Sequence, residues 1–343
     1  MHSATRRHAL GLGIVAGTSA LAAVLNPVYG AGESGEHAAN QLAGLRFRLG
    51  PAYKPALSAT AQKQLAGATL DFLLASHPQG TTLSMWDTDP RDLPFLKKHL
   101  LQVVSAVFTG AERNLPEQPV DPVLIMAMLY NESRFLPVAL SPAGALGMAQ
   151  FMPETALELG LKPVDRLDIW ARYRALRKSE GDRRAVQRQI FLDQFGMREF
   201  SAAAAIEKTL AAGDLTVLQT YQELATAVKP EAAILEEYVT TVRADLAELN
   251  FFDGDAARIT AIDSRTGYAA VSTAVDYVAR SLQENSGMTS SAVASYNAGL
   301  GAVKESNPAS VLYGYGNLPG YAETVRYLQR VMVVYTKLQE RLE

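Results

Sequence analysis

Apolar residues recur at three- and four-residue spacing along most of the chain, and alternation of apolar and polar residues at period two is nearly absent. The first spacing places apolar side chains on one face of an α-helix, whereas the second is typical of β-strands. The pattern therefore predicts an all-α (mainly α) protein. The clearest helices are expected over residues 60–76, 96–109 and 268–283, with a long loop over 78–94 that is rich in glycine, proline and aspartate.

A further helix is expected to begin at Asp121-Pro122. Aspartate accepts hydrogen bonds from the first free N–H groups of a helix, and proline at the first helical position loses no helical hydrogen bond. The segment is apolar through Tyr130, and Glu132 follows near its carboxyl end. There the helix dipole and apolar neighbours such as Phe135 disfavour ionisation, which would keep a proton available for general acid catalysis. A glutamate that simply points to water is the alternative.

The composition excludes several classes of site and partner. Cysteine is absent, so disulfide bonds, thiolate zinc sites and cysteine nucleophiles are excluded. A formal net charge of −3 provides no basic surface for nucleic acid. All the histidines precede residue 100, so the later segments offer no imidazole for a Ser-His-Asp relay or a zinc site. These histidines are His2, His8, His37, His77 and His99.

Residues 1–30 have the pattern of an export signal. Arg6 and Arg7 form a cationic start, residues 10–25 are mildly apolar, and small residues precede a potential cleavage point near Ala31. The paired arginines and the modest hydrophobicity resemble a twin-arginine leader. Cleavage would leave a periplasmic or secreted protein with no stable membrane span, and a retained amino-terminal anchor is the alternative.

Three later segments carry the candidate chemistry, and they are Glu132-Ser133-Arg134-Phe135, Gly144-Ala145-Leu146-Gly147-Met148-Ala149-Gln150 and Ser295-Tyr296-Asn297-Ala298-Gly299. In this order they resemble the signatures of the soluble lytic transglycosylases, whose catalytic domain shares its fold with goose-type lysozyme. Residues 318–331 resemble that family's final helix, and Tyr327 matches its tyrosine. Ala149 stands where relatives commonly have methionine, and Ser295 where they have alanine. These two departures concern glycan affinity more than catalysis.

The resemblance implies an enzyme that cleaves peptidoglycan glycan strands with one catalytic glutamate, Glu132, and that requires no metal or organic cofactor. It would protonate the oxygen between N-acetylmuramic acid and N-acetylglucosamine while the substrate's own acetamido oxygen attacks C1. It would then remove the proton of the C6 hydroxyl, which closes on C1 to leave a 1,6-anhydro end. Tyr327 would orient Glu132. Ser133, Gln150, Tyr296 and Asn297 would position the sugar.

Two alternatives remain open. A hydrolytic muramidase or chitinase-like enzyme on the same fold would need a second carboxylate to activate water. Asp263, Asp276 and Glu323 are candidates, and each is interpreted more simply as a capping or surface acid. The second alternative is a non-catalytic glycan-binding subunit of an envelope assembly, although such a protein has no physical need of Glu132 or Tyr327.

Beyond the leader, the chain is expected to divide into a helical extension over residues 31–118 and a lysozyme-like domain formed by 119–160 and 263–343. A helical insertion over 161–262 interrupts that domain. The insertion carries clustered cations, which are interpreted either as a solvated helix face or as a site for an anionic wall polymer or for a partner in an envelope assembly. These cations are Arg172, Arg174, Arg177, Lys178, Arg183, Arg184 and Arg188.

Overall fold

The computed structural model describes residues 55–164, 167–198, 200, 202–226, 231–248, 256–304 and 322–343. The leader expected over residues 1–30 lies outside the described residues. Within the described ranges the protein is all-α, with a few isolated β-bridges and no named strand, as the apolar spacing predicts. No helix in these ranges combines the length and the apolar character needed to cross a membrane.

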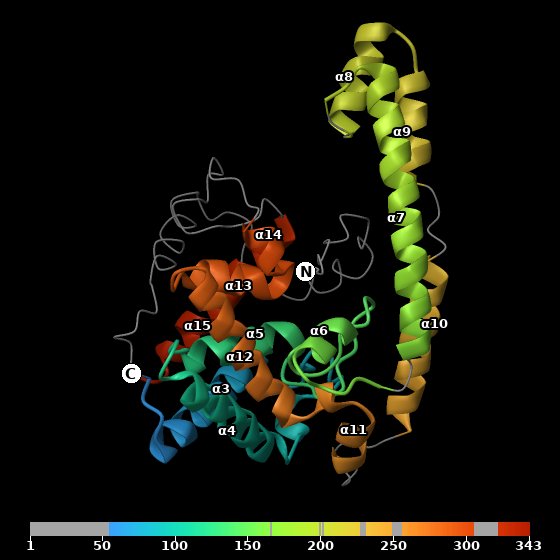
Figure 1. The fold of residues 1–343 in the computed structure, drawn as a ribbon. Coiled ribbons are helices and arrows are strands. Elements are labelled where there is room, and N and C mark those ends of the chain that lie inside the picture. The colour runs from blue at the N-terminus through green and yellow to red at the C-terminus, as the bar shows by residue number, and fades with distance from the viewer. Residues whose placement is uncertain are drawn as a thin grey trace. The chain divides into compact units, whose positions relative to one another are not determined.

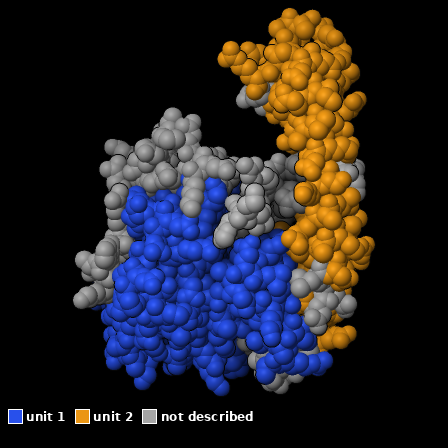
Figure 2. Space-filling view, in the orientation of Figure 1, with its two compact units in different colours: residues 1–141, 145–163, 249–343 blue, residues 142–144, 164–248 orange. Residues whose placement is uncertain are grey.

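Two compact units make up the chain (Figure 2). The first comprises residues 1–141, 145–163 and 249–343, and the second comprises residues 142–144 and 164–248. The second unit is thus an insertion in the first, and it also takes three residues from the glycine-rich segment that precedes Gln150.

Helices that are distant in sequence share one hydrophobic core in the first unit (Figure 1). Helix α4 packs against α3 and α12, α15 packs against α5 and α13, and α12 packs against α13. The two helices of the expected extension, α3 and α4, therefore contribute to the same core as the candidate catalytic helix α5. These helices are α3 (Ala59–Ser76), α4 (Leu96–Asn114), α5 (Pro122–Ser133), α12 (Tyr268–Glu284), α13 (Thr289–Ala298) and α15 (Ala322–Gln339).

Shorter elements complete the first unit, and they are η2 (Pro90–Asp92), α6 (Pro153–Glu158), α11 (Ala256–Ile262), η4 (Ser264–Thr266) and α14 (Leu300–Lys304). Helix α4 extends beyond the predicted residue 109 to Asn114. The added turn is held to α12 because Arg113 forms an ion pair of 2.5 Å with Asp276, and Asn114 donates to the same carboxylate at 2.6 Å.

Helix α5 lies in the middle of this core and has the caps that its sequence predicts. Asp121 accepts a hydrogen bond from the Val123 N–H at 2.9 Å, and Pro122 occupies the first helical position. The Tyr335 hydroxyl of α15 donates to the other Asp121 oxygen at 2.7 Å. Residues 124–130 are all buried, so α5 is enclosed on every side. Packing therefore fixes the end of the helix on which Glu132 lies.

The second unit is a long helical hairpin. Helices α7 (Leu167–Phe195) and α10 (Glu231–Ala247) lie side by side (Figure 1). At a rise of 1.5 Å per residue, α7 alone is roughly 40 Å long. Helices α8 (Ala202–Ala212) and α9 (Thr216–Thr226) pack together, and α9 contacts α7.

Two small cores stabilise the hairpin. One contains Phe191, Ala205 and Val217 from α7, α8 and α9. The other is an aromatic cluster of Trp170, Tyr173 and Tyr238, in which the Trp170 ring centroid lies 5.0 Å from each tyrosine centroid. The cationic side chains described on α7 are exposed, and the pattern is that of a solvated helix face; they are Arg172, Arg174, Lys178, Arg183 and Arg188. The first of them pairs with Glu237 of α10 at 3.3 Å.

His99 of α4 contacts the segment that follows α5, although it is distant in sequence. Its Nε2 lies 2.8 Å from the Phe135 carbonyl oxygen, and its Nδ1 lies 2.8 Å from the Tyr268 hydroxyl. A carbonyl can only accept, so the neutral ring carries its proton on Nε2. The side chain is 3% exposed, and its burial lowers its pKa to about 4. This imidazole has a structural role, because both nitrogens are occupied and solvent is excluded.

Lowering the pH should destabilise the fold through His99. Its folded-state pKa of about 4 lies below the usual histidine pKa of 6.5, so the unfolded state binds a proton first as the pH falls. Stability should be complete above pH 6.5 and should decrease by roughly 3 kcal/mol as the pH approaches 4. Denaturant titrations of the wild type and of His99→Leu at pH 7 and pH 4 would measure this. Equal losses of unfolding free energy in the two proteins would contradict the assignment.

Candidate active site

Glu132 is the penultimate residue of α5 and is half-buried. The chain leaves the helix abruptly, because Arg134 and Phe135 both adopt the left-handed conformation, with φ of 53° and 64°. The Arg134 N–H still bonds to the Tyr130 carbonyl at 3.0 Å and thus closes the last turn. This ending keeps Glu132 on the final turn of a buried helix.

Tyr327 of α15 lies beside Glu132. Its side chain is 3% exposed, and among the described residues no partner meets its hydroxyl at full hydrogen-bond geometry. Burial raises the pKa of Tyr327 well above its usual value, and the charge and acceptor oxygens of the nearby Glu132 carboxylate raise it further. The phenol is therefore neutral, and it lies beside the carboxyl group. The nearby Tyr296 of α13 also raises the pKa of Tyr327.

Two arginines that sequence reasoning did not assign also act on this carboxyl group. Arg134 is 4% exposed, donates to the Tyr130 carbonyl and places its guanidinium carbon 4.1 Å above the Tyr130 ring. Burial lowers the pKa of Arg134 and of Arg330, while the negative charge of Glu132 opposes that shift in both. Their positive charges favour the ionised form of the Glu132 carboxyl group, whereas the helix dipole and the apolar neighbours favour its protonated form. Arg134 stood within the motif, whereas Arg330 gave no signal beyond its position one turn after Tyr327.

Ser133 and Tyr296 use their hydroxyl groups to hold the loop between α5 and α6. The Ser133 hydroxyl donates to the Met148 carbonyl at 2.9 Å, and the Tyr296 hydroxyl donates to the Ala149 carbonyl at 2.7 Å. Ser133 is fully buried, and Tyr296 is 5% exposed. Both hydroxyl groups are therefore bonded to the loop backbone. Either residue would influence a bound sugar by positioning that backbone.

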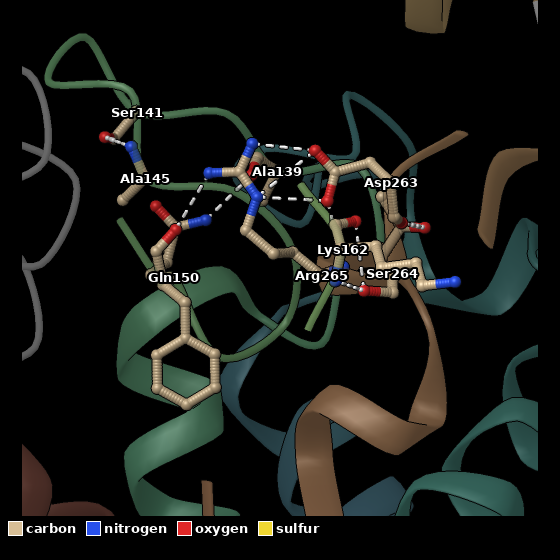
Figure 3. A network of polar contacts seen from close by, with 10 residues as sticks. Ala139, Ser141, Ala145, Gln150, Lys162, Asp263, Ser264 and Arg265 are labelled. Carbon is tan, nitrogen blue, oxygen red and sulfur yellow. Dashed lines mark hydrogen bonds and ion pairs between the residues drawn. The ribbon is translucent and has the colours of Figure 1, made fainter. Parts of the chain in front are cut away.

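Gln150 closes the same loop from within. Its side-chain nitrogen donates to the Ala139 carbonyl at 2.7 Å and to the Gly147 carbonyl at 2.9 Å (Figure 3). Its backbone adopts a φ of 49°, which a residue other than glycine rarely adopts without support. The half-buried side-chain amide thus fixes a tight turn, and its oxygen remains the group with which it can accept a hydrogen bond from a sugar hydroxyl.

Asn297, by contrast, links two helices. Its side-chain oxygen accepts from the Thr324 hydroxyl at 2.8 Å, which joins α13 to α15 close to Tyr327. The residue is half-buried, so its amide nitrogen is the group available to a ligand. Glu132, Tyr296, Asn297 and Tyr327 are thus gathered where α5, α13 and α15 pack together.

A fully buried ion pair also supports the loop between α5 and α6. Arg265 donates through two nitrogens to Asp263, with a shortest distance of 2.7 Å, and both side chains are 0% exposed (Figure 3). Arg265 also donates to the Phe151 carbonyl at 3.0 Å. Gly147, at a φ of 84°, approaches so closely that an added Cβ would lie 1.9 Å from the Arg265 carbonyl oxygen. Glycine is therefore required at this point.

Two of the three acids considered for activating water have structural partners. Asp263 caps η4 and pairs with Arg265, and Asp276 pairs with Arg113. Glu323 is exposed in the first turn of α15. The first two acids therefore have the capping and surface roles that their sequence context predicts. Within the described residues, no group of three or more histidine and carboxylate side chains is arranged to hold a metal ion.

Residues 112–171 match the family model described as Transglycosylase SLT domain. The matched segment runs from the end of α4 through α5, the Gln150 loop and α6 to the start of α7. No curated protein and no solved structure matches the chain. The matched residues include Glu132, Ser133 and Gln150, whereas Tyr296, Asn297 and Tyr327 reach the site through the fold.

Removing Asp263 should strongly destabilise the protein. Asp263→Ala would leave the Arg265 guanidinium buried without its counter-charge, at a cost of about 3 to 5 kcal/mol. The matched control is Glu284→Ala, which breaks the partly exposed 3.8 Å pair with Arg280 and should cost about 0.5 kcal/mol or less. Chemical denaturation would measure both, and similar losses in the two variants would refute a supporting role for the buried pair.

Proposed function

Because the chain carries a transglycosylase SLT domain with an all-α, lysozyme-like fold, we propose that it is an exported lytic transglycosylase of peptidoglycan. The bond cleaved is the β-1,4 linkage between N-acetylmuramic acid and N-acetylglucosamine, and the product carries a 1,6-anhydro end. The observation that supports this proposal best is the burial of the Tyr327 phenol beside Glu132.

Glu132 is the proposed catalytic acid and base. In the first step its proton passes to the glycosidic oxygen, the C1–O bond breaks, and the substrate's acetamido oxygen forms a bond to C1. In the second step the Glu132 carboxylate takes the proton of the C6 hydroxyl, whose oxygen displaces the acetamido oxygen from C1. The carboxyl group ends as it began and no water is consumed, so a single glutamate suffices.

The surrounding charges fit a group that must exist in both protonation states. The helix end favours the acid form needed for the first step, and the nearby Arg134 and Arg330 favour the carboxylate needed for the second. Tyr327 donates toward Glu132 and fixes its orientation. In this proposal Gln150 and Asn297 bind sugar groups, while Ser133 and Tyr296 hold the loop that places them.

The structural roles of Asp263 and Asp276 favour this chemistry over a hydrolytic muramidase or chitinase-like reaction, which needs a carboxylate to activate water. A non-catalytic glycan-binding subunit is the remaining alternative, with the hairpin of the second unit as a surface for an envelope-assembly partner. The proposed location is periplasmic or secreted, with residues 1–30 as a twin-arginine-like export signal, because peptidoglycan lies outside the cytoplasm.

Glu132→Gln should abolish cleavage, because an amide cannot deliver the proton. We expect a rate loss of at least about a hundredfold. Residues 31–343 of the wild type and of the variant would be incubated with purified peptidoglycan, and the released muropeptides analysed by mass spectrometry. Products lighter by one water than hydrolysis products, and absent with the variant, are expected. Products that contain the added water would favour a muramidase, and no release by the wild type would favour a binding subunit.

Tyr327→Phe should reduce the rate without destabilising the fold. Its hydroxyl has no partner at full hydrogen-bond geometry among the described residues, so stability should be unchanged, whereas turnover should fall about tenfold or more as Glu132 loses its orientation. Tyr335→Phe, two turns along the same helix, is the matched control. It removes a buried bond to Asp121 and should cost about 1 kcal/mol of stability with turnover unchanged. The reverse pattern would remove Tyr327 from the mechanism.

A further inference from the structure

The tip of the Gln150 loop belongs to the second unit. Residues 142–144 cluster with residues 164–248, while Ser141 and Ala145 on either side belong to the first unit. Two hydrogen bonds join Ser141 and Ala145, the residues at the base of this tip. The Ser141 N–H donates to the Ala145 carbonyl at 2.8 Å, and the Ala145 N–H donates to the Ser141 hydroxyl oxygen at 2.9 Å. The tip is therefore a short loop whose two ends are joined to each other.

Gly144 lies directly against the aromatic cluster of the hairpin. An added Cβ would lie 3.0 Å from Cζ3 of Trp170 and 3.1 Å from Cε1 of Tyr238. Trp170 is 3% exposed and Tyr238 is 0% exposed, so neither ring can turn aside into solvent. With a φ of 89°, Gly144 has a backbone conformation that suits glycine, and an added Cβ would require the two rings to move by a few tenths of an ångström.

The chain runs without interruption from Gly144 to Gln150. Beyond Ala145, the loop backbone is held by Ser133, Tyr296 and the Gln150 side chain. The loop that is proposed to hold the glycan thus has residues in both units. Ser141 and Ala145 are bonded to each other, so a displacement of Gly144 would be passed on through Ala145. Only five residues separate Gly144 from Gln150.

We propose that Trp170 and Tyr238 are positioning residues for glycan binding, and that the inserted hairpin thereby sets the affinity of the active site. This inference rests on the proposed function, and it gives the insertion a role inside the enzyme in addition to any role as a docking surface. The aromatic cluster holds Gly144, Gly144 holds the loop, and the loop places the Gln150 amide that receives the sugar. Neither aromatic residue touches the substrate.

A double-mutant cycle tests the contact. Gly144→Ala should raise KM for soluble glycan strands about tenfold with a much smaller change in kcat, because the loop is displaced and Glu132 is not. Gly160→Ala is the matched control, since Gly160 has a φ of 76° and no atom within 4 Å of an added Cβ. It carries the same backbone strain without the collision, and its KM should remain that of the wild type.

Trp170→Phe serves as the conservative variant. The indole N–H has no hydrogen-bond partner among the described residues, so phenylalanine loses no such bond and keeps an aromatic ring in the cluster. It also removes the atom nearest to Gly144. Trp170→Phe alone should change KM by less than about threefold, and in its background Gly144→Ala should have an effect at least about threefold smaller than in the wild type. Effects that simply multiply would overturn the proposal.

A second readout does not depend on turnover. The chain has two tryptophans, Trp86 and Trp170, so protein labelled with 5-fluorotryptophan gives two ¹⁹F signals, and Trp170→Phe assigns them. In the Glu132→Gln background, soluble glycan strands should bind without cleavage and shift the Trp170 signal. Gly144→Ala should shift the same signal without glycan, and Gly160→Ala should not.

The outcomes separate this proposal from the function on which it rests. If the wild type releases hydrolysis products, the proposed reaction fails while KM and the ¹⁹F shifts still test the positioning. If the wild type releases nothing, the ¹⁹F titration alone tests whether the aromatic cluster positions the loop for glycan binding. A Trp170 signal that glycan leaves unchanged, or a KM for Gly144→Ala equal to that for Gly160→Ala, would overturn the role of the aromatic cluster.

Discussion

Most of the site depends on one requirement, which is that the buried backbone of the loop between α5 and α6 must find donors for its carbonyl groups. An unpaired buried carbonyl costs about 1 to 3 kcal/mol. Ser133, Gln150, Arg265 and Tyr296 supply donors from four separate parts of the chain. Three of them, Ser133, Gln150 and Tyr296, were predicted to position a sugar, so residues of the candidate site also support their own loop.

Contacts at the two ends of the insertion explain why it does not disrupt the domain. Leu161 packs into the first core. The Lys162 N–H donates to the Ser264 hydroxyl oxygen at 2.6 Å and the Ser264 N–H donates to the Lys162 carbonyl at 2.8 Å, so the two ends of the interrupted domain are joined. The compact second unit takes Val164–Glu248 from this part of the chain, together with residues 142–144, whereas the sequence predicted an insertion over 161–262. An added segment can be long when its ends are fixed side by side.

Local patterns were enough for the helices. The apolar spacing predicted α3 and α12 to within about one residue at each end, and Asp121 with Pro122 predicted the start of α5, because helix propensity and capping depend on residues a few positions apart. The end of α4 was predicted five residues too early. Its last turn is stabilised by Arg113 and Asp276, which no local pattern connects.

By itself the sequence determined the helical class, the position of Glu132 at a helix end and the motif that matches a transglycosylase domain. Only the tertiary structure decided which distant side chains meet these elements. It brings His99 to the Phe135 carbonyl, Arg330 to the neighbourhood of Glu132, and Trp170 to Gly144. Contacts of this kind depend on how whole helices pack, whereas periodicity, caps and motifs report only the conformation and chemistry of neighbours along the chain.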